Sequence, residues 1–351
     1  MRIHANFTGG NILVEKVEND FVFLEREIRD TEGDWFYWAF CVEEAAGMTL
    51  TFRFPYDARV GRFGPAVSHD LKNWHWLDVP SWGDSFTYTF GPGENKVFFA
   101  HNMLYHPERF LDFCMNKELP VETVCPSVKG RDLPGTRFGS GDKWILLTAR
   151  HHACESTGSY VLEGVLDTLL PALPEEYSVL VIPFVDYDGV VDGDQGKNRK
   201  PHDHNRDYTD EPIYAVVDYM MQFGRKNNLM YTFDFHSPWH QGGQNDHVFL
   251  SRSTEAMEPF TDHFAEFFKK ETADIVLHYD RIHDVGPNEQ WNDENSPNSK
   301  NYFSKQSSVK LSVTLETPYF GLAETKISQS NMLELGEAFG RAILCYITEN
   351  P

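Results

Sequence analysis

The sequence is poor in basic residues, and no stretch is apolar for the roughly 18 residues that a membrane-spanning helix needs. Its 31 lysines and arginines stand against 53 aspartates and glutamates, for a formal net charge of -22. Such a field repels nucleic acid phosphates and anionic membranes, so we expect neither as a partner. The five cysteines form no Cys-x-x-Cys pair, and no signal-like apolar segment follows Met1. These absences favour a cytoplasmic protein with reduced thiols, the alternative being a secreted protein whose leader was removed.

Residues 1–95 are predicted to form an antiparallel β-sandwich. Short alternating apolar runs are separated by turns rich in glycine and aspartate, and no segment has clear helical periodicity. The expected strands are Phe21–Leu24, Trp35–Phe40, Met48–Phe54 and Ser85–Phe90. The tryptophans suit stacking on a sugar or packing in a core or against a second domain, and we expect packing. They are Trp35, Trp38, Trp74, Trp76 and Trp82.

Residues 96–351 are predicted to form an α/β domain, because strands there alternate with longer helices. The expected strands are 97–100, 144–147, 178–184, 230–235 and 309–315. The expected helices are 106–117, 156–170, 211–226, 253–272 and 323–348. The polar stretch Gly286–Lys305 is expected to be a long loop, and long loops inside compact domains are often functional.

Three potential metal ligands follow predicted buried strands. His152 and Glu155 lie where the strand 144–147 gives way to a helix, and His236 ends another strand. Ligands of open α/β sheets gather at the carboxyl ends of strands, so we expect the three side chains to meet. Two imidazoles and one carboxylate, with a position left for water, suit a catalytic zinc ion. His151 is a competing ligand, and each residue taken alone also suits an ordinary buried or edge position.

The stretch Lys197–Arg206 is locally basic within an acidic chain, with four cations within ten residues. One interpretation is a solvated basic loop. The other is a clamp for a carboxylate, because the planar fork of arginine matches two oxygens. Asp203 in the same stretch is expected to accept the free N–H of a ligating histidine, which would fix its tautomer.

Glu316 ends the predicted strand 309–315. The plain interpretation is a carboxylate at the rim of the sheet. Beside a water activated by a metal, it would take the proton during attack and deliver it to the leaving amine.

Four short motifs together resemble the zinc metallocarboxypeptidase family. They are Arg150-His151-His152-Ala153-Cys154-Glu155, Asp203-His204-Asn205-Arg206, Asp234-Phe235-His236 and Thr314-Leu315-Glu316, in the order and approximate spacing of that family. The chain is most similar to the cytosolic carboxypeptidase branch, whose members carry a β-sandwich before the catalytic domain. Phe63–Ser68 followed by Trp74 is similar to part of that sandwich, so the resemblance covers nearly the whole chain. Ala153-Cys154 replaces the Pro-Gly common in that branch.

The resemblance implies a carboxypeptidase A-like α/β/α catalytic domain with a mixed sheet. One zinc ion would be held by His152, Glu155 and His236, with Glu316 as general base and acid. Asn205 and Arg206 would bind the terminal carboxylate of the substrate, and Asp203 would support a ligand.

Two further family features are an arginine that polarises the scissile carbonyl and a tyrosine that closes over the substrate. Arg199 is the expected oxyanion residue. Lys197 is the alternative, because the spacing before Asn205 departs from the usual pattern. Tyr302 is the expected closing tyrosine, since it lies in the corresponding part of the chain.

The sequence therefore predicts a zinc-dependent exopeptidase that removes the C-terminal residue of a peptide or protein. Two other classes remain: a zinc amidohydrolase of N-acyl amino acids with the same ligands, and a non-catalytic protein whose sandwich binds a glycan or a partner. Lys197, Arg199 and Lys200 favour removal of an acidic residue, whereas the net charge opposes polyglutamate tails. The residue removed and the oligomeric state stay open.

Overall fold

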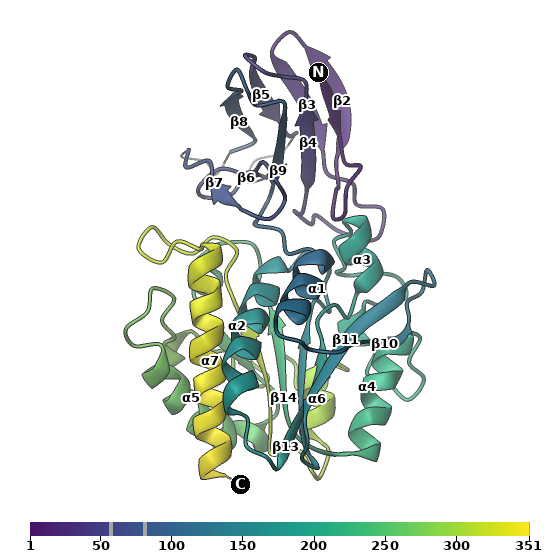
Figure 1. Cartoon of the computed structure of the whole chain (residues 1–351), viewed down its shortest axis with the longest axis vertical. Helices are drawn as coiled ribbons and strands as arrows, with labels where there is room; N and C mark the ends of the chain where they lie inside the picture. Colours follow the sequence, from purple (N-terminus) through teal and green to yellow (C-terminus); the bar gives the residue numbers. More distant parts are fainter. Residues whose placement is uncertain (56–58, 80–82, 351) are drawn as a thin grey trace.

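A computed structural model describes residues 1–55, 59–79 and 83–350. A smaller β-domain at the N-terminus stacks on one end of a larger α/β domain, and the C-terminus lies at the opposite end of the larger domain (Figure 1). Trp82 lies outside the described residues.

Two sheets form the β-domain within the described ranges. The five-stranded sheet is antiparallel throughout, and its strands in order are β1 (Arg2–His4), β4 (Ala39–Glu43), β9 (Lys96–Ala100), β6 (Ala66–Ser68) and β7 (His75–Trp76). The four-stranded sheet has the order β2 (Leu13–Glu18), β3 (Phe21–Glu25), β5 (Thr49–Arg53) and β8 (Ser85–Thr89), and β3 runs parallel to β5. Residues alternate between the two faces of a strand, so β3 buries Val22 and Leu24 and exposes Phe21. The predicted sandwich is confirmed, with one parallel pair.

The predicted domain boundary at residues 95 and 96 would cut the five-stranded sheet. β9 begins at Lys96 and pairs along its length with β4, from Glu43↔Lys96 to Ala39↔Ala100. We therefore place the boundary after Ala100. The glycine-rich turn before β9 connects the two sheets of the sandwich, from β8 to β9, so the change in sequence pattern after it does not mark a domain boundary.

A mixed sheet forms the centre of the larger domain, with seven strands in the part of the chain that is described. Their order is β10 (Val121–Pro126), β11 (Asp132–Gly139), β13 (Tyr177–Ile182), β12 (Lys143–Ala149), β14 (Asn228–His236), β16 (Leu311–Glu316) and β15 (Phe249–Arg252). The four central strands are parallel and the outer pairings are antiparallel. β13 and β16 are buried along their whole length, as expected for strands covered by helices on both faces.

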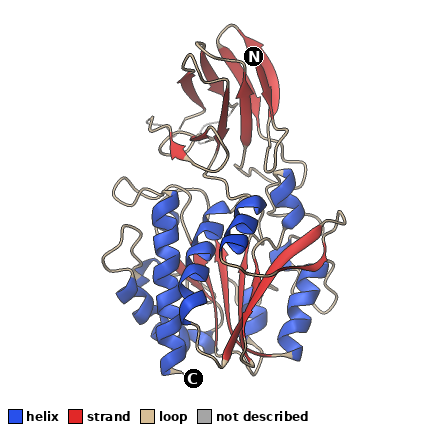
Figure 2. Ribbon diagram, viewed as in Figure 1, coloured by secondary structure: helices blue, strands red, loops and turns tan. Residues whose placement is uncertain are grey.

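Helices cover both faces of this sheet (Figure 2). The helices are α1 (Pro107–Asn116), α2 (Ser156–Ala172), α3 (Tyr187–Asp192), α4 (Ala215–Lys226), α5 (Glu258–Glu271), α6 (Ser299–Ser304) and α7 (Gln329–Glu349). Four short 3-10 turns within the described ranges are η1 (His204–Arg206), η2 (Gly243–Asp246), η3 (Glu255–Met257) and η4 (Arg281–His283). α2, α5 and α7 share one apolar cluster, and α4 and α6 contribute to the cluster on the opposite face. Among the described residues, no helix is both long and apolar enough to cross a bilayer.

The expected helices exist, but three begin later than predicted. α7 begins at Gln329 rather than at 323, because Ser328 and Asn331 form a reciprocal capping box there. α5 begins at Glu258, with Pro259 in its first turn. α4 begins at Ala215, beyond the helix-breaking Pro212. The expected loop Gly286–Lys305 contains the short helix α6.

Tryptophans join the two domains, as the packing interpretation predicts. Trp76 is buried and its indole N–H donates to the carbonyl of Ile327 at 2.8 Å. The backbone N–H of Trp74 donates to the side chain of Gln329 at 2.8 Å. Trp38 is buried inside the sandwich. A buried indole cannot stack on a sugar, so these three side chains do not favour glycan binding.

The contact between α2 and α7 depends on small residues. A Cβ atom on Gly164 would lie 2.1 Å from the carbonyl oxygen of Leu333, so the helices must separate to admit it. We expect Gly164→Ala to lower the free energy of unfolding by about 1–3 kcal/mol, measured by urea unfolding. Gly93→Ala is the matched control, because nothing lies within 4 Å of its Cβ position, and it should change stability by less than about 0.5 kcal/mol. Equal stability of the two variants would contradict close helix packing.

Candidate active site

Three parallel strands bring the predicted ligands to one edge of the sheet. In the register of β12 and β14, Ala149 pairs with Phe235, so His152 follows β12 just beyond the level where β14 ends at His236. His236 in turn pairs with Glu316, the last residue of β16. The backbone leaves β12 sharply through Arg150, which has a positive φ of 62°. This edge is where open α/β sheets bind their ligands.

His152, Glu155 and His236 meet as predicted. Their ligand atoms lie within 4.8 Å of one another, and all three line a cavity of about 710 Å³. His152 Nδ1 lies 2.9 Å from Glu155 Oε1, and His236 Nδ1 lies 2.7 Å from Glu155 Oε2. Glu155 is fully buried, yet its Oε2 accepts no hydrogen bond from the described residues. Two imidazole nitrogens, one beside each oxygen of a buried carboxylate, fit a divalent metal ion such as zinc.

A second cluster of possible ligands lies behind the first. It consists of His151, Asp234 and His236, all buried. Both ring nitrogens of His151 have protein partners, since Nδ1 lies 2.9 Å from Asp234 Oδ1 and Nε2 lies 2.8 Å from the hydroxyl of Tyr208. The cavity is lined by His152 and not by His151, within the residues described. We therefore favour His152 as the ligand.

Asp234 has the supporting position that the sequence analysis gave to Asp203. Asp234 Oδ2 lies 2.8 Å from His236 Nε2, which leaves Nδ1 directed at Glu155. Burial raises the pKa of Asp234, but the charges of His151 and His236 outweigh it and hold that pKa below its usual value. Asp203 Oδ1 lies 3.7 Å from His152 Nε2, too far for a hydrogen bond. The signal for Asp234 was its place two residues before His236, on the same face of β14.

Glu316 lies at the cavity wall beside the ligand group. Its side chain is buried and its Oε2 has no hydrogen-bond partner among the described residues. Burial raises the pKa of Glu316 to about 7, against the opposing charge of His236. A carboxyl group with a pKa near neutrality is suited to accept and return a proton.

Lys197 is the cation that reaches this group. Its Nζ lies 2.5 Å from Glu155 Oε1 and 5.2 Å from the ring centroid of Trp35, which comes from the sandwich domain. Burial disfavours the ammonium, but Glu155 outweighs burial and raises the pKa of Lys197. Lys197 therefore places a full positive charge in the cavity.

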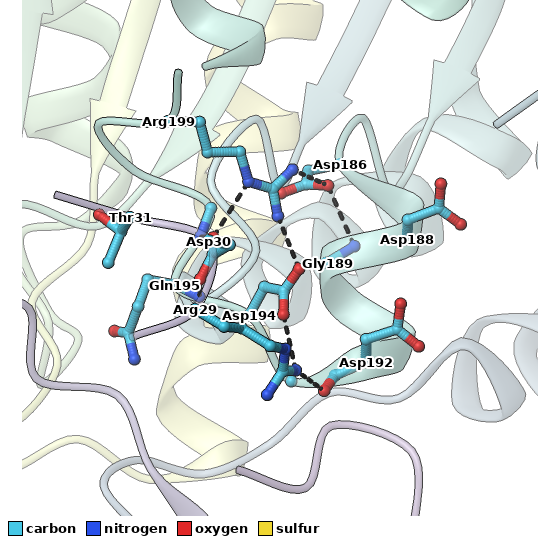
Figure 3. Close-up of polar contacts among 12 residues, drawn as sticks. Arg29, Asp30, Thr31, Asp186, Asp188, Gly189, Asp192, Asp194, Gln195 and Arg199 are labelled. Carbon is cyan, nitrogen blue, oxygen red and sulfur yellow. Dashed lines mark hydrogen bonds and ion pairs between the residues drawn. The ribbon is translucent and has the colours of Figure 1, made fainter. Parts of the chain in front are cut away.

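The assignment of Arg199 as the oxyanion residue is corrected by its position. Its guanidinium contacts Asp30 at 3.0 Å, Asp186 at 2.9 Å and Asp194 at 3.0 Å (Figure 3), and among the described residues Arg199 does not line the cavity. Each of its three nitrogens thus donates to a carboxylate. Lys197, the alternative, is the residue of this loop that faces the ligand group.

Tyr302 is also misplaced by the sequence analysis. It lies on α6 with its ring 5.7 Å from that of Tyr208 and the guanidinium of Arg225 over it at 5.8 Å, and it lines a separate surface hollow. Residues two apart on a helix point in opposing directions, so Lys300 faces the cavity instead. Lys300 was not among the predicted site residues, although it lies in the stretch Gly286–Lys305 that was expected to be functional.

Asn205 and Arg206 line the same cavity through the 3-10 turn η1. Asp203 caps this turn by accepting the N–H of Asn205 at 3.0 Å. Asn205 Oδ1 accepts the N–H of Ser299 at 3.2 Å, which links the turn to α6. Arg206 is exposed and lines the cavity, and its Nη1 donates to the carbonyl of Asn205 at 2.9 Å.

Solved structures with this two-domain architecture cover the whole chain. A metallo-carboxypeptidase from Burkholderia cenocepacia superposes with a TM-score of 0.84 over 100% of this chain and 99% of its own, at 20% identity. A metallo-carboxypeptidase from Pseudomonas aeruginosa, in complex with (2-guanidinoethylmercapto)succinic acid, gives 0.80 over 100% of both chains, at 20% identity. At this identity the likeness establishes the fold.

Carboxypeptidases are also found among the curated sequences that resemble this chain. No family model matches the chain. An uncharacterized protein of Zymomonas mobilis is 24% identical over 307 residues, 80% of this chain and 79% of that protein. Cytosolic carboxypeptidase 6 of Caenorhabditis elegans is 24% identical over 295 residues, 70% of this chain and 63% of that protein. The match thus spans less than two thirds of the nematode protein.

The fold is that of solved metallo-carboxypeptidases, and the cavity contains a group of side chains that could hold a metal ion. A cytosolic carboxypeptidase is among the sequence relatives, and this chain has a β-sandwich ahead of its α/β domain. The resemblance drawn from the four motifs is confirmed.

The two neighbouring histidines allow a direct test of the ligand assignment. We expect His152→Gln to weaken zinc binding by about 100-fold or more, because it removes a ligand, and His151→Gln to weaken it less, because it acts only through Asp234. The measurement is competition with a chromogenic chelator, with folding checked by circular dichroism. A larger loss of affinity in His151→Gln would move the site to the second cluster.

Proposed function

We propose that this protein is a zinc-dependent carboxypeptidase that hydrolyses the C-terminal peptide bond of a peptide or protein. The observation that carries the proposal is one cavity lined by His152, Glu155, His236, Glu316 and Arg206. Metal ligands, a general base and a carboxylate receptor are the three parts that this reaction needs.

His152, Glu155 and His236 would hold the zinc ion, and Asp234 would fix the tautomer of His236. The ion, when bound, would polarise the scissile carbonyl and lower the pKa of the attacking water. Glu316 would accept a proton from that water and return it to the departing amine. Its pKa near 7 suits both steps at neutral pH.

Lys197 would stabilise the negative charge that develops on the carbonyl oxygen during attack. Its ammonium already lies against the ligand group, and Arg199 is engaged elsewhere. Asn205 and Arg206 would bind the terminal carboxylate of the substrate and so select chains with a free carboxyl end.

The buried ammonium of Lys300 favours substrates that end in an acidic residue. Lys300 is 5% exposed, and Nζ donates to Asn292 Oδ1 at 2.7 Å. No carboxylate of the described residues forms an ion pair with it, and burial lowers the pKa of Lys300 to about 7. A buried charge without a counter-ion is costly, so a carboxylate on the entering side chain would complete the pocket.

Lys200 and Arg199 do not contribute to this preference for an acidic residue. Lys200 is exposed and pairs with Glu32 at 2.9 Å, and Arg199 faces other carboxylates. A cytoplasmic location remains part of the proposal, supported by the cytosolic carboxypeptidases among the sequence relatives.

Glu316→Gln tests the proposed reaction. The amide cannot accept the proton, so we expect kcat to fall by about 10²- to 10⁴-fold while zinc affinity stays unchanged. The assay compares free-acid peptides, the same peptides with C-terminal amides, and N-acyl amino acids. Wild-type turnover of amides equal to that of acids would remove Arg206 as a receptor, and turnover of acyl amino acids alone would favour an amidohydrolase.

Lys300→Met tests the proposed specificity. We expect kcat/KM for a peptide ending in glutamate to fall by about 30-fold or more, with little change for its glutamine counterpart. Because the pKa of Lys300 lies near 7, deprotonation above that pH should also reduce the preference of the wild type for glutamate over glutamine. Lys305→Met, an exposed lysine of the same segment, is the control and should behave as wild type. Equal losses on both peptides would contradict the assignment.

A further inference from the structure

A short segment of the sandwich domain lies against the loop that carries Lys197. We call residues 29–35 the sandwich arm; it connects β3 to β4. It lies beside the loop 194–200, and Arg29, Asp30 and Thr31 are seen next to Asp194, Gln195 and Arg199 (Figure 3). The arm belongs to one domain and the loop to the other, so their contacts link the sandwich directly to the cavity.

Asp30 binds the backbone of this loop with both carboxylate oxygens. Oδ1 accepts the N–H of Gln195 at 3.1 Å, and Oδ2 accepts the N–H of Gly196 at 2.8 Å. Oδ2 also accepts from Arg199 Nε at 3.0 Å. A partly buried carboxylate with three donors is strongly held, because hydrogen bonds to an ionised group are roughly twice as strong as neutral ones.

Further hydrogen bonds join the arm to Lys197 and to its neighbour Asn198. The hydroxyl of Thr31 donates to the carbonyl of Lys197 at 2.5 Å. The side-chain amide of Asn198 donates to the carbonyl of Glu32 at 2.5 Å, and the N–H of Glu32 donates to the carbonyl of Asn198 at 3.3 Å. Backbone atoms of the loop are thus bound to the arm on each side of the lysine.

On its other side the loop lies against the metal-ligand segment. Gly196 has a φ of 74°, and a Cβ there would lie 2.1 Å from the backbone nitrogen of Ala153, between His152 and Cys154. The carbonyl of Gln195 accepts the N–H of Cys154 at 3.2 Å. The loop is therefore a layer between the arm and the ligands, and a shift of the arm would shift Lys197 relative to Glu155.

Ion pairs around Arg199 connect the arm to the loop. Asp186 is fully buried and Asp194 nearly so, and both contact Arg199 together with Asp30. Burial and the charge of Asp30 raise the pKa of Asp194 to about 6, while Arg29 and Arg199 oppose them. At neutral pH the carboxylates depend on two arginines, one from each domain, for compensation.

We infer that the sandwich arm, through Asp30, is a positioning element that sets Lys197 against the reacting carbonyl. The sandwich is then a working part of the active site and not only a neighbouring domain. This inference rests on the proposed role of Lys197 in hydrolysis. Asp30 does not line the cavity formed by the described residues, so it acts through the loop as a positioning residue.

The test is a double-mutant cycle in the full-length, zinc-loaded chain, with Asp30→Ala, Lys197→Met and both together. We expect Asp30→Ala to lower kcat by about 10- to 100-fold with a smaller change in KM, since displacement of a catalytic group by an ångström can cost that much. The double variant should be no slower than Lys197→Met alone, because Asp30 acts only through Lys197. Additive losses would overturn the inference.

Two further variants separate positioning from stability. Asp30→Asn keeps the shape but removes the charge, so it replaces Asp30→Ala in the cycle if the latter does not fold. Glu32→Gln removes the exposed ion pair between Glu32 and Lys200 across the same contact and should leave kcat as in wild type.

Amide hydrogen exchange measures how firmly the loop is held, independently of catalytic activity. We expect the Asp30 variants to speed exchange at Gln195 and Gly196 by at least tenfold, with exchange in β12 and β14 unchanged. Unchanged exchange at the loop would overturn the inference whatever the kinetics. If the wild type hydrolyses no peptide, the proposed function fails, and exchange still decides whether Asp30 holds the loop.

Discussion

The fully buried carboxylate of Glu155 is the constraint on which the site depends. A buried carboxylate is costly unless positive or metal partners surround it, and here two imidazoles and Lys197 converge on its oxygens. Burial alone would raise the pKa of Glu155, but Lys197 and the histidines outweigh it and lower that pKa. The partners come from the β12 turn, the end of β14 and the loop after α3, so correct folding of three distant segments is coupled to one charge.

The two domains also share the largest apolar cluster of the described residues. Trp76 and Phe36 of the sandwich lie in the same cluster as Leu147 and Phe235 of the catalytic sheet. In the loop 194–200, Asp194 is buried, as is Asp186 nearby, and burial strengthens the ion pairs that both make with Arg199. The sandwich therefore contributes to the site in two ways, through apolar contact and through the polar bonds of its arm.

Much of this could be predicted because the strongest signals are local. Apolar strands that end in His236 and Glu316 identify the carboxyl edge of a parallel sheet from sequence alone. The roles predicted for Arg199 and Tyr302 could not be judged from such local signals. Each lies two residues from the side chain that faces the cavity, Lys197 or Lys300, and the choice depends on partners such as Asp30 and Tyr208 that are distant in sequence. The domain boundary failed because the long-range pairing of β9 with β4 leaves no local trace.

The charge balance of the molecule gives a last constraint on substrates under the proposed function. The net charge of -22 repels a long polyanion, yet the cavity contains Lys197, Lys300 and Arg206. Fields of exposed charges are screened beyond about 8 Å at physiological salt, whereas buried ammonium groups act at full strength over contact distances. A single acidic residue at a chain end would thus gain from the pocket without bringing much charge near the acidic surface. Repulsion by the acidic surface and attraction by the cations of the cavity therefore act over different distances. Together they favour a short acidic terminus over a polyglutamate tail.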